Sequence, residues 1–231
     1  MNIRIVTTHN PAHWSAYVQR NLESVLDYLP YEVVSYYEGE QPPLKHARLV
    51  WRDLDNVPGA SKFVDEAAEF PPACGQFEQY DYNYDACKFA RKVYAQCDAA
   101  TEEADVLIWL DSDVEVLAPL SEGQIETILN GMPMARYQRN NMHTETGVVF
   151  WDLRQDITQT FFRHYRYLYD SRRVYTLGPG WHDCWAMDAV INALRMETTH
   201  LSRHPERLEV VSSSDLGVIF RHDKGARKYA A

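Results

Sequence analysis

The chain has 231 residues, of which 45% are hydrophobic and 24% charged, a balance typical of a globular protein rather than a disordered one. Its formal net charge of −10 argues against broad, non-specific binding to nucleic acid or to anionic membranes. No apolar run approaches the roughly 18 residues of a membrane span, and we expect no secretory leader. Because none of the four cysteines forms a close Cys-x-x-Cys pair, we expect a soluble cytoplasmic protein with reduced thiols.

The first part of the chain opens with a strand, a helix and a second strand. Residues 3–8 are rich in β-branched side chains and predict a strand, and residues 31–37 predict another. Between them, residues 13–29 carry apolar side chains at spacings of three and four, which indicates a helix. This β-α-β opening favours a parallel sheet. Residues 40–83 are rich in proline and acids and predict long surface loops, with one short helix at 61–70.

The later elements alternate around a strongly apolar strand at 105–110, which is preceded by a helix at 84–95. Ser121 is expected to cap a helix that ends near Gly131. The remaining elements are strands at 134–138, 147–153, 208–212 and 217–221 and helices at 155–169 and 183–196. Because there is no repeat, linker or low-complexity tract, the sequence predicts a single α/β domain.

Two carboxylates follow the central strand directly. Asp111 and Asp113 stand at positions i and i+2, so at the end of a strand their side chains point the same way. Open α/β sheets bind ligands at this edge. Two like charges held together repel unless a cation or a proton lies between them, and their hard oxygens suit Mg²⁺ or Mn²⁺. The alternative is a pair of solvated loop acids.

Three stretches of sequence together resemble the glycosyltransferase A-type (GT-A) fold. "VLIWLDSDVEVLAPL" (106–120) has the family's apolar strand, D-x-D, short apolar strand and Pro-Leu. "TETGVVFWDLR" (144–154) is similar to the strand that lines the sugar and acceptor pocket, and "HDKGARK" (222–228) matches the H-x-x-G-x-x-K signature of the glycogenin-like retaining enzymes. The resemblance implies one GT-A domain over 1–231. Its mostly parallel, Rossmann-like central sheet would be flanked by helices, with a smaller mixed sheet in the C-terminal half.

The C-terminal signature supplies residues suited to a metal and a diphosphate. In the family its histidine is the third metal ligand, which implies that role for His222 beside Asp111 and Asp113. Gly225 would let the backbone approach a phosphate, and Lys228 would bind the diphosphate. Metal and lysine together would stabilise the charge on the departing nucleoside diphosphate.

Further donor contacts are expected at the ends of two strands. In this fold the end of the first strand meets the nucleotide base, which makes Thr7 and Thr8 candidates; ordinary turn chemistry is the alternative. Ser112, between the two acids, is counted with the donor contacts.

The helix at 84–95 carries a second group of candidates. Asp85, Lys88 and then Arg91 or Lys92 recur along one face. In similar enzymes a helix at this place offers an acid to the base and a cation to phosphate, so Asp85, Lys88 and Arg91 are expected donor contacts. The alternative is a solvated face with an internal ion pair.

Two acids are candidates for the sugar side of the site. Glu145 could bind an acceptor hydroxyl or steady an oxocarbenium ion. Asp183 follows a glycine-rich loop and is either a helix N-cap or a contact of the donor sugar. No clear nucleophile is visible, so front-face displacement with retention is expected; an inverting enzyme would use Asp183 or Glu145 as its base.

The sequence therefore predicts a metal-dependent hexosyl- or pentosyltransferase that uses Mn²⁺ or Mg²⁺ and a nucleotide-sugar, with a UDP-sugar favoured by the resemblance. The acceptor stays open between a saccharide, a protein and a modified nucleic acid. A phosphatase of the haloacid-dehalogenase type is a rival, although Glu115 stands where that family has threonine or valine. A nucleotidyltransferase would need a glycine-rich, arginine-bearing loop near the first strand. A catalytically silent sugar- or nucleotide-binding protein is the third alternative.

Overall fold

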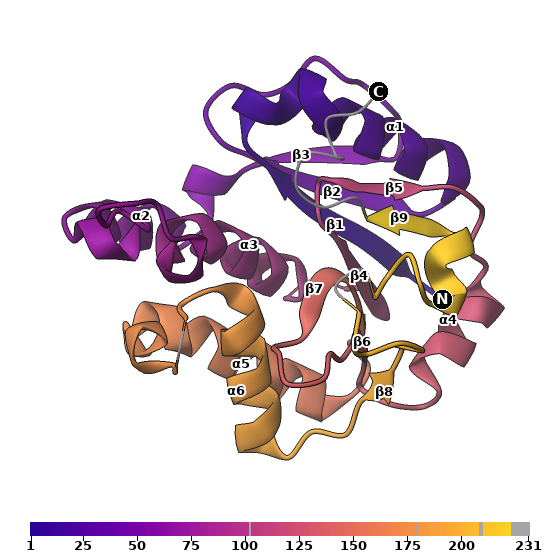
Figure 1. Ribbon diagram of the computed structural model, residues 1–231. Coiled ribbons are helices and arrows are strands. Elements are labelled where there is room, and N and C mark those ends of the chain that lie inside the picture. Colours follow the sequence, from indigo (N-terminus) through magenta and orange to yellow (C-terminus); the bar gives the residue numbers. More distant parts are fainter. Residues whose placement is uncertain (102, 179, 208–209, 223–231) are drawn as a thin grey trace.

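The protein is built on a seven-stranded sheet with the strand order β3-β2-β1-β4-β7-β6-β8 (Figure 1). The computed structural model describes residues 1–101, 103–178, 180–207 and 210–222. The strands of the large sheet are β1 (Ile3–His9), β2 (Glu32–Tyr37), β3 (Leu49–Asp53), β4 (Val106–Leu110), β6 (Met134–Tyr137), β7 (Glu145–Asp152) and β8 (Thr199–His200). Within this sheet β7 runs antiparallel to both of its neighbours, and the other pairings are parallel.

Helices cover both faces of the sheet, which is why its central strand is apolar along its whole length. The helices are α1 (Gln19–Tyr28), α2 (Ala60–Ala68), α3 (Ala86–Ala99), α4 (Glu122–Leu129), α5 (Asp156–Asp170) and α6 (Asp183–Leu194). In β4, Leu107 and Trp109 belong to the core beneath α2, α3, α5 and α6. Ile108 and Leu110 point the other way, into the core beneath α1 and α4. The mostly parallel α/β sheet flanked by helices is confirmed.

A second sheet pairs β5 (Val114–Val116) with β9 (Phe220–His222). The expected smaller sheet thus exists, and it consists of two antiparallel strands. Val116 and Phe220 bury their side chains in the core beneath α1 and α4. This pairing carries the end of the described chain back to the carboxyl end of β4, because β5 follows the Asp111–Asp113 turn directly.

The structure differs from the sequence-based expectation in three places. Strand β3 lies within the stretch 40–83 that was expected to form loops; it is a half-buried edge strand without the alternation that would reveal it. The prediction of a strand at 208–212 is wrong for residues 210–212, the part that the structure describes, because these residues form turns. The strand expected at 217–221 begins late, because a 3₁₀ turn at Asp215–Val218 precedes β9. In that turn a Cβ on Gly217 would lie 2.4 Å from the carbonyl oxygen of Ser212.

Two cysteines form a disulfide, which overturns the expectation of reduced thiols. The bond joins Cys74, in the loop after α2, to Cys87 in the first turn of α3. Their spacing of 13 residues resembles no short cysteine motif, so this pairing could not be predicted from the sequence. Cys97 and Cys184 are free. Among the described residues, no helix is both long and apolar enough to cross a membrane.

Candidate active site

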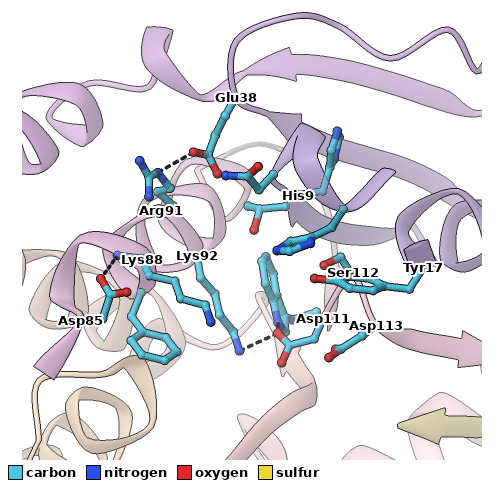
Figure 2. A pocket seen from close by; sticks show the side chains of 15 residues that line it. His9, Tyr17, Glu38, Asp85, Lys88, Arg91, Lys92, Asp111, Ser112 and Asp113 are labelled. Atoms are coloured by element: carbon cyan, nitrogen blue, oxygen red, sulfur yellow. Dashed lines mark hydrogen bonds and ion pairs between the residues drawn. The ribbon is translucent and has the colours of Figure 1, made fainter. Parts of the chain in front are cut away.

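A cavity of about 510 Å³ lies at the carboxyl ends of β1 and β4, beside the first half of α3 (Figure 2). Parallel strands present their ligand-binding edge here. Its volume falls within the usual range for small-molecule sites. The cavity is lined by Thr8, His9, Asn10, His13, Tyr17, Glu38, Asp85, Lys88, Phe89, Arg91, Lys92, Trp109, Asp111, Ser112 and Asp113.

A buried lysine connects the first acid of the D-x-D to α6. Lys92, on α3, places its Nζ 2.6 Å from Asp111 Oδ1 (Figure 2). The same Nζ lies 2.9 Å from Asp183 Oδ2. The same Nζ donates to the carbonyl and the hydroxyl oxygens of Thr146, at 3.0 and 2.9 Å. Asp111 Oδ1 also accepts a hydrogen bond of 2.8 Å from the indole nitrogen of Trp109. The carboxylate is therefore fixed from two sides.

The charges of this network reinforce one another. Burial by itself would lower the pKa of Lys92, but the nearby carboxylates Asp111 and Asp183 outweigh it and raise that pKa. Burial would likewise raise the pKa of Asp183, whereas Lys92 above all lowers it, to about 2. Lys92 is consequently a fixed cation, and Asp183 a fixed anion, at physiological pH.

The small sheet brings His222 to the D-x-D. In the pairing of β5 with β9, His222 stands opposite Val114, next to Asp113. Its Nε2 lies 3.2 Å from Asp113 Oδ1, and its Nδ1 lies 3.6 Å from Glu145 Oε1. A Cβ on Gly147 would lie 2.4 Å from the His222 ring, so this close approach requires glycine.

These residues fit a divalent cation. Asp111, Asp113 and His222 offer ligand atoms that all lie within 4.8 Å of one another. The buried Nδ1 of His222 has no hydrogen-bond partner within the residues that the structure describes. Two carboxylates with one imidazole form a donor set that Mn²⁺ accepts and Mg²⁺ tolerates. The three residues that the sequence singled out as metal ligands are brought together.

Most of the expected donor contacts line the cavity. Thr8, Ser112, Asp85, Lys88 and Arg91 all do so. Asp85 also caps α3 by accepting a 2.9 Å hydrogen bond from the Lys88 backbone, and Arg91 pairs with Glu38 at 2.8 Å (Figure 2). These side chains thus make contacts within the protein, as the alternative of a solvated face with internal ion pairs assumed, and they also line the cavity.

Thr7 lies apart from the cavity. Its side chain is only 2% exposed, because successive residues of β1 face opposite sides of the sheet and Thr8 takes the cavity side. Gly225 and Lys228 lie outside the described residues.

The two acids expected on the sugar side are buried behind the cavity wall. Glu145 accepts from the Gly147 backbone at 3.1 Å, and its other oxygen lies 3.3 Å from Arg139. Asp183 is 1% exposed and accepts a 2.6 Å hydrogen bond from the Thr146 hydroxyl. Asp183 is not the N-cap of α6, because His182 occupies that position without a side-chain cap bond.

Several lining residues escaped the sequence-based prediction: His9, Asn10, His13, Tyr17, Glu38, Phe89 and Trp109. Lys92 also lines the cavity; the sequence placed it with Arg91 on the same helix face, but Lys88 and Arg91 were the preferred donor contacts. His13 and Tyr17 come from the turns that precede α1, where their rings stack at 5.1 Å. No motif marks such residues, because they reach the cavity only through the packing of α1 on the sheet.

Comparison with known proteins supports the fold. No family model and no curated protein sequence matches the chain. Among solved structures, the chain is similar to the crystal structure of mouse xyloside xylosyltransferase 1 in its apo form, with a TM-score of 0.54 and 13% identity. The likeness covers 97% of this chain and 98% of that one. At such low identity the shared property is the architecture, so the predicted GT-A-type fold is confirmed.

Proposed function

We propose that the protein is a metal-dependent glycosyltransferase, formed by one GT-A domain over 1–231. The observation that carries the proposal is the meeting of Asp111, Asp113 and His222 at the edge of a cavity that also holds cationic side chains. A nucleotide-sugar is polyanionic and needs both features: ligands for a metal and positive charge along the diphosphate. The xylosyltransferase fold supports the same reaction class.

The metal ligands would hold Mn²⁺ or Mg²⁺, which supplies a positive charge against the diphosphate of the donor. Lys88 and Arg91 line the same cavity and would bind phosphate oxygens. Trp109 and Lys92 fix Asp111, so the carboxylate needs little reorganisation to act as a ligand. From its place in the C-terminal signature, Lys228 would add a charge at the leaving group.

The nucleoside would occupy the part of the cavity near β1. Thr8 and Asn10 offer polar groups there, and the ring of Tyr17 gives a flat apolar surface. A uracil base is small, is recognised by few hydrogen bonds and stacks on an aromatic ring, so a UDP-sugar is the favoured donor.

Retention of the anomeric configuration is the favoured stereochemical course. An inverting enzyme needs a general base with a pKa near the working pH, whereas Lys92 holds the pKa of Asp183 at about 2. Glu145 is occupied by Arg139 and by the Gly147 backbone. We therefore assign Asp183 and Glu145 to positioning of the donor sugar and its neighbours. Nuclear magnetic resonance of the first product formed would reveal the anomer.

A saccharide is the favoured acceptor. A second cavity of about 580 Å³ is lined by Phe77, Gln79, Tyr80, Asp81, Tyr84 and Trp181. Aromatic rings beside polar groups suit the apolar face and the hydroxyls of a sugar. A 2.8 Å hydrogen bond from the Tyr80 hydroxyl to Asp85 connects this cavity to the donor cavity. A protein or modified nucleic acid could present such a sugar, although the net charge of −10 disfavours nucleic acid.

The decisive experiment is a calorimetric screen of nucleotide-sugars with Mn²⁺ present, followed by turnover assays with the donor that binds. Asp113→Asn should lower turnover by about a hundredfold or more, because the charge that develops on the leaving group loses its stabilisation. Asp65→Asn, on the exposed face of α2, is the matched control and should change nothing. Full turnover in excess chelator would contradict the proposal, and donor binding without any turnover would favour the silent binding protein.

A further inference from the structure

A second group of potential metal ligands lies behind the donor cavity. His143, His182 and Cys184 offer ligand atoms that all lie within 4.8 Å of one another. His143 stands just before β7, and the other two residues flank Asp183 at the start of α6. The two imidazole rings meet at 4.4 Å between centroids, and the ring of Phe89 closes the group towards the donor cavity.

The strongest sign that this group of residues binds an ion is His182. Its side chain is 1% exposed, yet neither ring nitrogen has a hydrogen-bond partner among the described residues. A neutral imidazole carries one donor and one acceptor, and burying both without partners is costly. An unsatisfied buried group of this kind calls for an occupant.

His143 is oriented as metal-bound histidines usually are. Its Nδ1 lies 3.0 Å from the carbonyl oxygen of Thr144. When Nδ1 donates to that carbonyl, Nε2 carries the lone pair that a metal needs, and an Arg139 nitrogen lies 3.4 Å from this Nε2. Arg139 also places a nitrogen 2.6 Å from the same Nδ1, and a nitrogen that donates to Thr144 cannot accept from Arg139. Arg139 keeps two other partners in that state, the carbonyl of His143 and Glu145.

Cys184 supplies the sulfur. It is free and half-buried, and its Sγ lies 3.1 Å from the Thr146 hydroxyl. A thiolate with two imidazoles is a set of borderline and soft ligands, which zinc prefers and Mg²⁺ does not.

We propose that His143, His182 and Cys184 bind Zn²⁺ at a site distinct from the D-x-D. Three protein ligands leave one of the four positions of zinc open to a small ligand or to water. The site brackets Asp183, so an ion there fixes the first turn of α6 and, through it, one partner of Lys92. The two sites divide the metals by chemistry: hard Mn²⁺ or Mg²⁺ among carboxylates, zinc among nitrogen and sulfur. The proposal stands whether or not the protein transfers sugars.

Cobalt substitution tests the proposal directly, because Co²⁺ takes zinc sites and shows a charge-transfer band only when a thiolate coordinates it. The full chain carrying Asp111→Asn and Asp113→Asn is titrated with Co²⁺, so that the oxygen-rich site does not compete. We expect the thiolate band to saturate at one equivalent and to disappear when Zn²⁺ is added. Adding Cys184→Ser should abolish the band, and His182→Asn should weaken binding by about a hundredfold or more, since even outer-shell partners account for about 10–100-fold.

Cys97→Ser is the matched control, because Cys97 is the other free thiol and lies in the core away from the cluster. It should leave the band unchanged. The proposal is overturned if the protein with Cys97 and Cys184 intact shows no thiolate band. It is also overturned if the thiolate band persists in Cys184→Ser. The test does not depend on whether the histidine variants fold, because the starting protein, with only Asp111→Asn and Asp113→Asn, must itself show the band. Circular dichroism checks the fold of each variant.

Discussion

Lys92 shows how one side chain can carry both the stability and the chemistry of a site. It is buried between β4 and α6 and neutralises two carboxylates, those of Asp111 and Asp183. A buried pair of this kind contributes little net stability compared with apolar residues, but the removal of one partner leaves an uncompensated charge. A substitution that removes the charge of Lys92 should therefore destabilise the fold and also disturb Asp111, the proposed metal ligand.

Replacing Lys92 by methionine tests this directly. Lys92→Met keeps the aliphatic stem and removes the charge, so Asp111 and Asp183 lose their counter-ion. We expect unfolding in urea to need about 3–5 kcal/mol less free energy. Lys62→Met is the control: its side chain on α2 is exposed, and its pairing with Glu66 spans 3.8 Å. The control should change stability by less than about 0.5 kcal/mol. Equal losses in the two variants would contradict this view of Lys92.

Gly147 offers a second test at this scale, because it sets how close His222 can come to the acids. In Gly147→Ala the new Cβ would meet the His222 ring at 2.4 Å, so the ring must move. We expect the affinity for Mn²⁺, measured by calorimetry, to fall about tenfold or more, as commonly happens when a residue that positions a metal ligand is changed. Gly123→Ala on α4 is the control, since a Cβ there meets nothing within 4 Å. Unchanged Mn²⁺ affinity in Gly147→Ala would remove His222 from the metal site.

At the scale of elements, α3 is the part of the molecule on which most of the site depends. Its first turn is capped by Asp85 and tied by a disulfide to the loop after α2, and its next turns present Lys88, Arg91 and Lys92. The same loop carries aromatic residues of the second cavity. The cavities proposed for the donor and for the acceptor are thus both connected to the N-terminal end of α3.

Removing the disulfide should loosen this junction. Cys74→Ser with Cys87→Ser is expected to lower the free energy of unfolding by about 3 kcal/mol, since a loop of this length gains that much entropy in the unfolded chain. Turnover assays should show a higher KM for a saccharide acceptor and a smaller change in kcat. If KM and stability both stay at their original values, the bond has no role in shaping the loop.

At the scale of the whole molecule, buried histidines make stability depend on pH. Burial lowers the pKa of His9 to about 4, below its ordinary value of about 6.5. Between these values the unfolded chain binds a proton that the folded protein refuses, so stability falls as the pH falls through this window. His9 packs against the rings of Trp14 and Trp51, which shield its imidazole from water and so disfavour the charged form.

His9→Phe should therefore reduce the acid sensitivity of the fold. Between about pH 7.5 and about pH 5, the variant is expected to lose about 2 kcal/mol less free energy of unfolding than the parent protein, because pH 5 lies about one and a half units below the pKa of an unfolded histidine and each unit contributes about 1.4 kcal/mol. Urea denaturation at the two pH values measures this. An identical loss in both proteins would mean that His9 titrates normally in the folded state.

The sequence revealed the central strand, the D-x-D and the helix of cations because each rests on local periodicity or on residue type. A single strand end brings Asp111 and Asp113 side by side, and a single helix places Lys88 and Arg91 on one face. The disulfide, the edge strand β3 and the position of Asp183 depend instead on contacts between distant segments. Such contacts follow from the packing of the whole chain, which no short window of sequence contains.

The pairing of β5 with β9 has a consequence for the order in which the protein matures. Asp111 and Asp113 are synthesised before His222, which belongs to β9 and takes its place only when that strand docks on β5. During translation the two acids therefore stand for some time without His222, the proposed third metal ligand. Binding of a metal to the proposed ligand set would be coupled to this docking step, so the ion would draw together two segments that lie far apart in the sequence of a newly made chain.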